Sequence, residues 1–170
     1  MIYTLIYIAV LVFIGVFTLI AGIGGAPSVP SPKKAVKKMV SEMKIKPARI
    51  YYDLGAGDGR ILKRISEKKA VAVGFEYTPL TYLLAKIMLK CKKYKHTKLY
   101  WKNFYNEDLK NANGVFCFLS VKAMEKLEEK FNKELKFGTK VISYAFPLPQ
   151  KKPKKIIKNK GLAPIYVYQY

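Results

Sequence analysis

The sequence predicts an open three-layer α/β fold, in which five parallel strands and a closing antiparallel hairpin form one sheet. Short apolar runs alternate with helical segments along most of the chain. The run at 70–75 is apolar throughout, as expected of a parallel strand that is buried on both faces. Near the end of the chain the alternation stops, and two short strands follow one another with only a turn, 159–164, between them. These three observations define the fold class.

The elements follow in order from the first charged residues. Residues 33–43 have helical period, with Val36, Met39, Val40 and Met43 in one apolar stripe. We expect this stripe to face the core, although a helix lying on lipid is the alternative. The same periodicities predict strands at 50–54, 70–75, 98–101, 115–119, 141–146, 154–158 and 165–168, and helices at 59–68, 79–92 and 121–135.

Residues 1–25 are predicted to form a transmembrane anchor. The run carries no charged side chain, and a helix needs about 20 residues to cross the hydrocarbon core. A cleaved signal peptide needs a positive amino-terminal region and a shorter apolar core, so an uncleaved anchor is favoured. The small residues at 21–26 leave cleavage open. A proline-rich linker, 26–32, favours an extended path to the soluble domain at 33–170.

Charge is distributed unevenly along the chain. The sequence has 32 Lys and Arg against 11 Asp and Glu, a net charge of +21, and none of these residues precedes Lys33. The lysines that follow the anchor directly predict an amino terminus outside and a cytoplasmic domain, because positive flanks stay inside. We expect these lysines to lie on an anionic lipid surface. They are Lys33, Lys34, Lys37 and Lys38.

Several common kinds of site are excluded. One histidine, His96, and two cysteines, Cys91 and Cys117, cannot form a zinc site of the usual kinds, so no metal is expected. Both cysteines stand in apolar surroundings and are expected to be small buried residues. Trp101 is expected to be a packing residue. The Gly-Lys-Ser/Thr sequence of a P-loop is absent.

The motif D-L-G-A-G-D-G-R at 53–60 follows a predicted strand and opens a predicted helix. Its glycines allow a sharp turn and let a ligand approach the backbone, and the amides of the helix start offer hydrogen bonds. Glu76 ends the next strand, 21 residues after Gly55. In nucleotide-binding α/β folds an acid at this place takes the ribose hydroxyls. A structural turn without a ligand is the alternative.

The spacing of this motif does not fit a dinucleotide. The fingerprint G-x-G-x-x-G/A needs a small residue where Arg60 stands, and Asp58 would put a negative charge beside a pyrophosphate. The form D-x-G-x-G-x-G instead suits a cationic ligand without phosphates, and it is the pattern of class I S-adenosylmethionine-dependent methyltransferases. The fold class is therefore a seven-stranded, Rossmann-like class I methyltransferase sheet preceded by one transmembrane helix.

Three stretches resemble a family of small protein-lysine methyltransferases: V-P-S-P at 29–32, residues 52–61, and residues 103–148. The last contains K-E-L-K-F-G-T-K-V-I-S at 133–143, which is similar to the family's K-E-L-K-P-G-T-R-V-V-S. The family includes an archaeal broad-specificity enzyme and mitochondrial membrane-anchored enzymes, among them the ATP synthase c-subunit lysine methyltransferase. An amino-terminal membrane helix also occurs in it. The resemblance spans 29–170.

The resemblance implies S-adenosylmethionine as the cofactor and assigns residues to it. Glu76 would hold the ribose hydroxyls, and Asn103 with Phe104 would border the adenine. The residues of the glycine motif that would cradle the methionine part are Asp53, Gly55, Ala56, Gly57 and Gly59.

Three positions depart from the family's pattern. Lys102 stands where the archaeal sequence has Gly, Phe137 replaces the usual Pro, and Ala145 replaces an acidic residue of the archaeal sequence. If that acid helps to receive a substrate amine, substrate choice or activity differs here. Strand-end residues are candidates for the substrate mouth, with ordinary core and rim roles as the alternative. They are Ser120, Tyr144 and Phe146.

The predicted function is methylation of a lysine side chain on a membrane or membrane-associated protein. A low-dielectric mouth lowers the pKa of the lysine ammonium, so no dedicated base is required and none is assigned. An RNA or a lipid-headgroup methyltransferase would also suit the positive charge, as would a non-catalytic basic protein that binds a membrane surface. No separate RNA-binding module or interleaved aromatic and basic motif is visible, so nucleic acid is not favoured. The sequence does not indicate the target protein or the oligomeric state.

Overall fold

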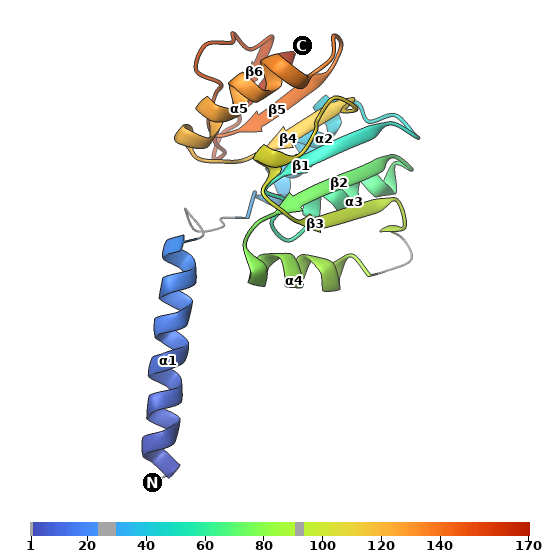
Figure 1. The fold of residues 1–170 in the computed structure, drawn as a ribbon. Helices are drawn as coiled ribbons and strands as arrows, with labels where there is room; N and C mark the ends of the chain where they lie inside the picture. The colour runs from blue at the N-terminus through green and yellow to red at the C-terminus, as the bar shows by residue number, and fades with distance from the viewer. Residues whose placement is uncertain (1, 24–29, 91–93) are drawn as a thin grey trace.

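The computed structural model describes residues 2–23, 30–90 and 94–170, which form a long amino-terminal helix and one α/β domain (Figure 1). The helices are α1 (Ile2–Ile23), α2 (Lys33–Met43), α3 (Arg60–Glu67), α4 (Pro79–Met88) and α5 (Val121–Glu134), with a short 3-10 helix, η2 (Phe104–Asn106). The strands are β1 (Ile50–Leu54), β2 (Val71–Glu76), β3 (Thr97–Trp101), β4 (Gly114–Cys117), β5 (Lys140–Tyr144), β6 (Lys155–Ile157) and β7 (Ile165–Gln169).

The seven strands form one sheet in the order β3-β2-β1-β4-β5-β7-β6. The first five strands pair in parallel, and β7 pairs antiparallel with both β5 and β6. The prediction of five parallel strands closed by an antiparallel hairpin is therefore confirmed. Because parallel strands end at the same edge of a sheet, the loops that follow β1 and β2 lie side by side there. We call this the carboxyl edge, and the opposite edge, where the parallel strands begin, the amino edge.

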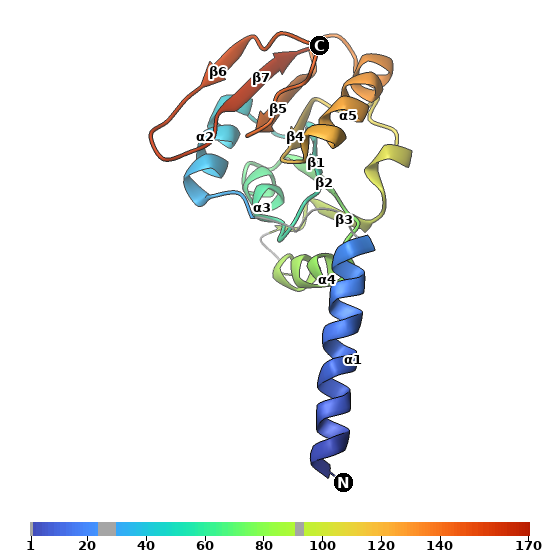
Figure 2. The same cartoon turned by 90° about the vertical axis from the view of Figure 1, so that its left-hand side faces the viewer.

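The core consists of two clusters, one on each face of the sheet. On one face α2 and α3 pack their apolar stripes against the sheet, with Met39 and Leu62 fully buried. On the other face α5 buries Met124, Leu127 and Phe131 against the sheet. Figure 2 shows this arrangement from the side, with α5 and α2 on opposite sides of the strands. The predicted core-facing stripe of residues 33–43 is confirmed.

Three elements end two or more residues earlier than predicted, each for a physical reason. Helix α4 stops at Met88, where the amide of Lys90 donates to the carbonyl of Ile87 in a tightened last turn. Strand β4 ends at Cys117, because its neighbour β1 turns away into the glycine motif after Leu54. Strand β5 ends at Tyr144, because the next residue, Ala145, has a φ of 70° and cannot continue an extended strand.

The amino-terminal helix α1 runs away from the domain (Figure 1). Its described side chains are those of residues 2–13 and 15, and those of 2–13 are exposed. No helix in the described part of the chain is long and apolar enough to cross a membrane. The expected transmembrane helix is therefore not found among these residues.

Two smaller expectations can be compared with the structure. Cys117 is a free, fully buried thiol, as predicted, and burial raises its pKa to about 12. Cys91 lies outside the described residues. Trp101, expected to be a packing residue, is instead 57% exposed, because it ends the edge strand β3.

Candidate active site

The glycine motif forms a tight loop at the carboxyl edge, between β1 and α3. Gly55, Gly57 and Gly59 all have positive φ, at 77°, 55° and 76°, which only glycine adopts without strain. The amides of Gly55 and Ala56 donate to the carbonyl of Phe75, at 3.0 and 2.9 Å, and tie the loop to β2.

The three glycines differ in what surrounds them. A Cβ atom added at Gly55 would lie 3.0 Å from Leu119, and one added at Gly59 would lie 3.0 Å from Leu89. A Cβ atom at Gly57 would meet nothing within 4 Å. The loop is therefore closed by packing at its two ends and open at its middle, where a ligand can reach the backbone.

Glu76 ends β2 with both carboxylate oxygens already oriented. Oε2 accepts from the amide of Gly57 at 2.9 Å, and Oε1 accepts from the amide of Thr78 at 2.9 Å. A carboxylate has about four lone-pair sites, so two remain for the hydroxyls of a ligand. Glu76 is buried, and its bond to Gly57 joins the acid and the glycine loop into one unit.

Asp53 is the second buried acid of the site, with 3% of its surface exposed. Burial, followed by the nearby carboxylates of Glu76 and Asp58, raises its pKa well above the ordinary range. A buried carboxylate in this position is stabilised when a positive charge is placed beside it. The site is therefore suited to a cation.

Asp58 and Arg60 form a clamp on the outer side of the loop. The Arg60 guanidinium donates to both carboxylate oxygens of Asp58, each at 2.8 Å, and lowers the pKa of this acid. The same guanidinium donates through Nη1 to the backbone carbonyl of Ser31, just before α2. Because Arg60 neutralises Asp58, the expected repulsion between Asp58 and a pyrophosphate is removed. Only the spacing of the glycines then argues against a dinucleotide as the ligand.

These features fit S-adenosylmethionine. Its methionine part carries a sulfonium and an ammonium, and the buried carboxylate of Asp53 supplies the opposite charge. Its ribose hydroxyls match the free lone pairs of Glu76. Gly57, with open space where a side chain would be, leaves room for close approach.

Asn103 and Phe104, the residues expected to border the adenine, follow β3 at the same edge. Asn103 accepts a hydrogen bond from the amide of Tyr105 at 3.1 Å and thereby caps η2. Phe104 is half-buried, and its ring lies 4.4 Å from that of Tyr105. The register places Glu76 opposite Trp101, so η2 begins close to Glu76.

The three candidates for the substrate mouth have different environments. Ser120 is exposed and caps α5, its Oγ accepting from the amide of Ala123 at 3.4 Å. Tyr144 is buried, and its hydroxyl accepts from the amide of Ala163 at 3.3 Å. Phe146 is half-buried, and its carbonyl accepts from Ser143 Oγ.

Sequence reasoning did not find two features of this edge. The first is the bond from Arg60 to Ser31, whose acceptor is a backbone carbonyl and leaves no mark in the sequence. The second is a pair of exposed aromatic residues beside Glu76. Trp101 Nε1 donates to the carbonyl of Tyr77 at 2.9 Å, and both side chains are 57% exposed. In the sequence, this aromatic pair was indicated only by the position of both residues at the ends of predicted strands.

Comparison with known proteins gives consistent results. The ANTKMT methyltransferase domain family matches residues 53–155. A protein-lysine N-methyltransferase of Saccharolobus islandicus is 38% identical over 136 residues, which cover 78% of this chain and 84% of that protein. The human ATP synthase c-subunit lysine N-methyltransferase is 26% identical over 143 residues, which cover 84% of this chain and 60% of that protein.

A solved structure is also similar. The crystal structure of an RNA methyltransferase from Salinibacter ruber, in complex with S-adenosyl-L-homocysteine, superposes with a TM-score of 0.78. The sequence identity is 26%, and the match covers 83% of this chain and 93% of that chain. The bound molecule is the product that S-adenosylmethionine leaves after methyl transfer.

Proposed function

The chain belongs to the ANTKMT methyltransferase domain family and uses S-adenosylmethionine as its methyl donor. From that premise we propose that it methylates the side-chain amine of a lysine in a protein. The observation that carries the proposal is the cradle formed by Gly57, Asp53 and Glu76, which suits a cationic nucleoside. The lysine specificity is supported by the names of the similar enzymes.

The chemistry requires little of the protein beyond binding and positioning. When bound, S-adenosylmethionine would supply an activated methyl group: the lone pair of a neutral amine would form the new N–C bond in line with the S–C bond that breaks, and the thioether S-adenosylhomocysteine would leave. Asp53 would hold the positive charge of the cofactor, and Glu76 would hold its ribose hydroxyls. The hydrogen bond from the Gly57 amide to Glu76 fixes the two halves of the cradle relative to each other. Fixed geometry of this kind supplies much of the rate of a two-substrate reaction.

The positive charge of the chain assists the deprotonation of the substrate. A lysine ammonium has no lone pair and must lose a proton before it reacts. A net charge of +21 disfavours a further cation near the surface and therefore lowers the pKa of an approaching lysine. The same field repels a basic substrate at long range, so a substrate held nearby by other means is favoured.

We propose that a membrane provides that proximity. Residues 1–25 would be a single-pass anchor, with the amino terminus outside and the domain in the cytoplasm. The support is the absence of charge before Lys33 and the exposed lysines of α2, which would face anionic lipid. The substrate would be a membrane or membrane-associated protein.

Two features suggest that the carboxyl edge would face this membrane. The bond from Arg60 to Ser31 fixes the end of the linker beside the glycine loop. The nine residues between α1 and α2 reach at most about 30 Å, so the loop stays near the lipid surface. Helix α4, which starts from the same edge, exposes about half of each of five large apolar side chains: Leu80, Leu83, Leu84, Ile87 and Met88.

The test is transfer of labelled methyl groups. The full-length protein, with methyl-labelled S-adenosylmethionine, is incubated with membranes of its source cells, and the protein fraction is hydrolysed. We expect labelled methyl-lysine with the wild type and none with Asp53→Asn. Glu129→Gln, which removes an exposed acid of α5, is the matched control and should keep full transfer. Label in the lipid extract, or equal transfer by Asp53→Asn, would contradict the proposal.

RNA methylation is the second candidate, and one observation favours it. The similar structure from Salinibacter ruber is described as an RNA methyltransferase. In the same experiment, label that is recovered in extracted RNA and is sensitive to ribonuclease would replace lysine as the acceptor. The cradle and the cofactor would be unchanged in that case.

A further inference from the structure

A second site lies at the amino edge of the sheet, opposite the glycine loop. It is a cavity of about 670 Å³ formed by three segments, at 43–51, 110–113 and 136–140. These segments lead into β1, β4 and β5, three neighbouring parallel strands, so their starts meet at one edge. Asp53 and Glu76 stand near the other ends of β1 and β2, and no residue of the glycine loop lines this cavity.

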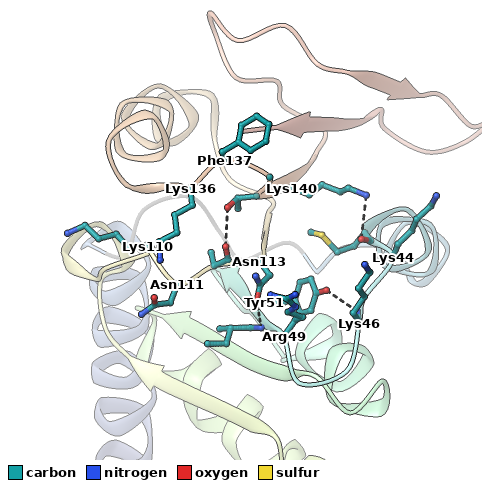
Figure 3. Close-up of a pocket in the computed structure, with 15 residues that line it drawn as sticks. Lys44, Lys46, Arg49, Tyr51, Lys110, Asn111, Asn113, Lys136, Phe137 and Lys140 are labelled. Atoms are coloured by element: carbon teal, nitrogen blue, oxygen red, sulfur yellow. Dashed lines mark hydrogen bonds between the residues drawn. The ribbon is translucent and has the colours of Figure 1, made fainter.

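The cavity is lined by positive charge. Its 15 lining residues include six cations and no acid. Figure 3 shows Lys110 and Lys136 on one side, and Lys44 and Lys46 on the other. The six cations are Lys44, Lys46, Arg49, Lys110, Lys136 and Lys140.

The protein offsets these charges only in part, through the nearby carboxylate of Glu42. Among the described residues, none of the six takes part in a salt bridge, and the nearby acid Glu42 pairs with Lys155 at 2.8 Å. Lys140 donates instead to the carbonyls of Glu42 and Met43, at 2.9 and 3.5 Å. Burial lowers the pKa of Lys140; Glu42 opposes this shift, and neighbouring lysines add to it, so an anion in the cavity would stabilise the ammonium.

An aromatic ring stands at the rim of this cavity. Phe137 has a relative exposure of 101%, so its side chain contacts almost nothing in the protein. It lies between Lys136 and Gly138 among the lining residues, and Figure 3 shows its ring at the outer edge of this group, turned away from Lys46 and Arg49. Exposed Asn111 adds an amide that can donate and accept hydrogen bonds. Cations that follow a phosphate backbone, with an aromatic ring for base stacking, are the features that bind single-stranded nucleic acid.

We propose that the amino-edge cavity binds single-stranded nucleic acid, with its phosphates on the lysines and an unpaired base on Phe137. The six cations exceed the charge on the phosphates of one nucleotide, which favours a polymer over a free nucleotide. The lipid surface is a poorer occupant, because the linker enters the domain at the opposite edge. This inference does not depend on the proposed methyl acceptor.

The test is the binding of a fluorescent oligouridylate to the full-length protein, followed by anisotropy over a range of salt concentrations. The triple variant Lys46→Gln, Lys110→Gln, Lys136→Gln should weaken binding about tenfold or more near physiological salt. Its slope of log affinity against log salt should fall by about 2, because each lost phosphate contact removes about 0.7. S-adenosylmethionine affinity should stay unchanged, which reports an intact fold and an intact cradle.

A charge-matched control separates a site from general attraction to a basic protein. The triple variant Lys122→Gln, Lys158→Gln, Lys160→Gln removes the same charge from exposed positions outside the cavity. It should change the affinity by less than about twofold. Equal losses in the two triple variants would mean diffuse attraction and would overturn the proposal.

Phe137→Ala tests the stacking part of the proposal. It should weaken binding of the single strand about tenfold, in line with the loss of one base–aromatic stack. Binding of a duplex of the same length should not change, because paired bases are not free to stack on the ring. An unchanged affinity for the single strand would overturn the role of Phe137.

Discussion

The two edges of the sheet present groups of opposite charge. At the carboxyl edge, two buried acids, Asp53 and Glu76, stand beside a glycine loop that is open at Gly57. At the amino edge, the lining of the cavity includes six cations and no acid. Arg60, the cation that ends the glycine motif, is paired with an acid of that loop. A basic chain thus keeps one acidic site, because Arg60 is paired with Asp58 and the raised pKa of buried Asp53 leaves a carboxyl that a bound cation would help to ionise.

The difference separates two kinds of recognition. The carboxyl edge is shaped by backbone geometry, since all three loop glycines have positive φ and Glu76 is bound to an amide. The amino edge is shaped by side-chain charge on exposed residues. A ligand at the first edge depends on fit and burial, whereas a ligand at the second depends on salt. Each of the following variants changes one edge and leaves the other unchanged.

Removal of the Asp53 charge should have the largest effect. In Asp53→Asn the cradle keeps its shape but loses its attraction for a cation, and we expect the Kd for S-adenosylmethionine to rise about a hundredfold, or about 3 kcal/mol. Isothermal titration checks this. Binding of the oligouridylate should be unchanged. A Kd within threefold of the wild type would mean that Asp53 does not interact with the cofactor.

The same carboxyl predicts how stability depends on pH. Because the pKa of Asp53 is raised in the folded protein, the folded state binds its proton more tightly than the unfolded state. Asp53 therefore destabilises the cofactor-free fold increasingly as pH rises above the ordinary value of 3.8 through the folded pKa. Asp53→Asn should unfold at a higher temperature than the wild type at pH 7, and the difference should shrink toward pH 4. A lower melting temperature at pH 7 would contradict this assignment.

Two glycine variants distinguish an end of the loop from its middle. Gly59→Ala places a Cβ atom 3.0 Å from Leu89 at a φ of 76°, so it should destabilise the fold by about 2 kcal/mol. Gly57→Ala meets no atom within 4 Å and should cost only about 1 kcal/mol, from its positive φ. The larger effect of Gly57→Ala should be a loss of cofactor affinity. Urea unfolding and cofactor titration of both variants check this, and equal losses of stability would contradict it.

Much of the carboxyl edge could be predicted from the sequence, because its signals are local. The positions of Asp53, the loop glycines and Glu76 relative to two strands were enough to place them together, and the register confirms that placement. The shortened ends of β4 and β5 could not be predicted, because they depend on the neighbouring strand and on the backbone of Ala145. The roles of the cofactor residues stay predictions that the variants test.

The amino-edge cavity could not be predicted, because its cations come from three distant segments. Lys46, Lys110 and Lys136 have no shared spacing, and each stands in an ordinary loop. Only the strand order places their loops together. An interleaved aromatic and basic motif is not visible in the sequence for the same reason, since Phe137 shares a cavity with Lys46 and Lys110 but not a stretch of chain.

Loss of the Arg60 clamp should have a moderate effect, confined to the carboxyl edge. Arg60→Gln removes the pair with Asp58 and the bond to Ser31, so it should destabilise the fold by about 1 kcal/mol and raise the pKa of Asp58 toward its ordinary value. The released negative charge should leave cofactor binding intact or tighten it. Thermal unfolding and titration check both effects. A large loss of cofactor affinity would instead assign Arg60 to the cradle itself.

The smallest effect compares two alanines with positive φ, one at each edge. Ala48, before β1, has a φ of 59° and is exposed, whereas Ala145, after β5, has a φ of 70° and packs against the core. Glycine relieves the strain at both positions but also makes the unfolded chain more flexible. Ala48→Gly should therefore stabilise the fold by about 0.5 kcal/mol. Ala145→Gly should gain less, because it also gives up the packing of a methyl group. Urea unfolding of the pair checks the order, and a larger gain at Ala145 would mean that the backbone at the carboxyl edge carries more strain than the amino edge.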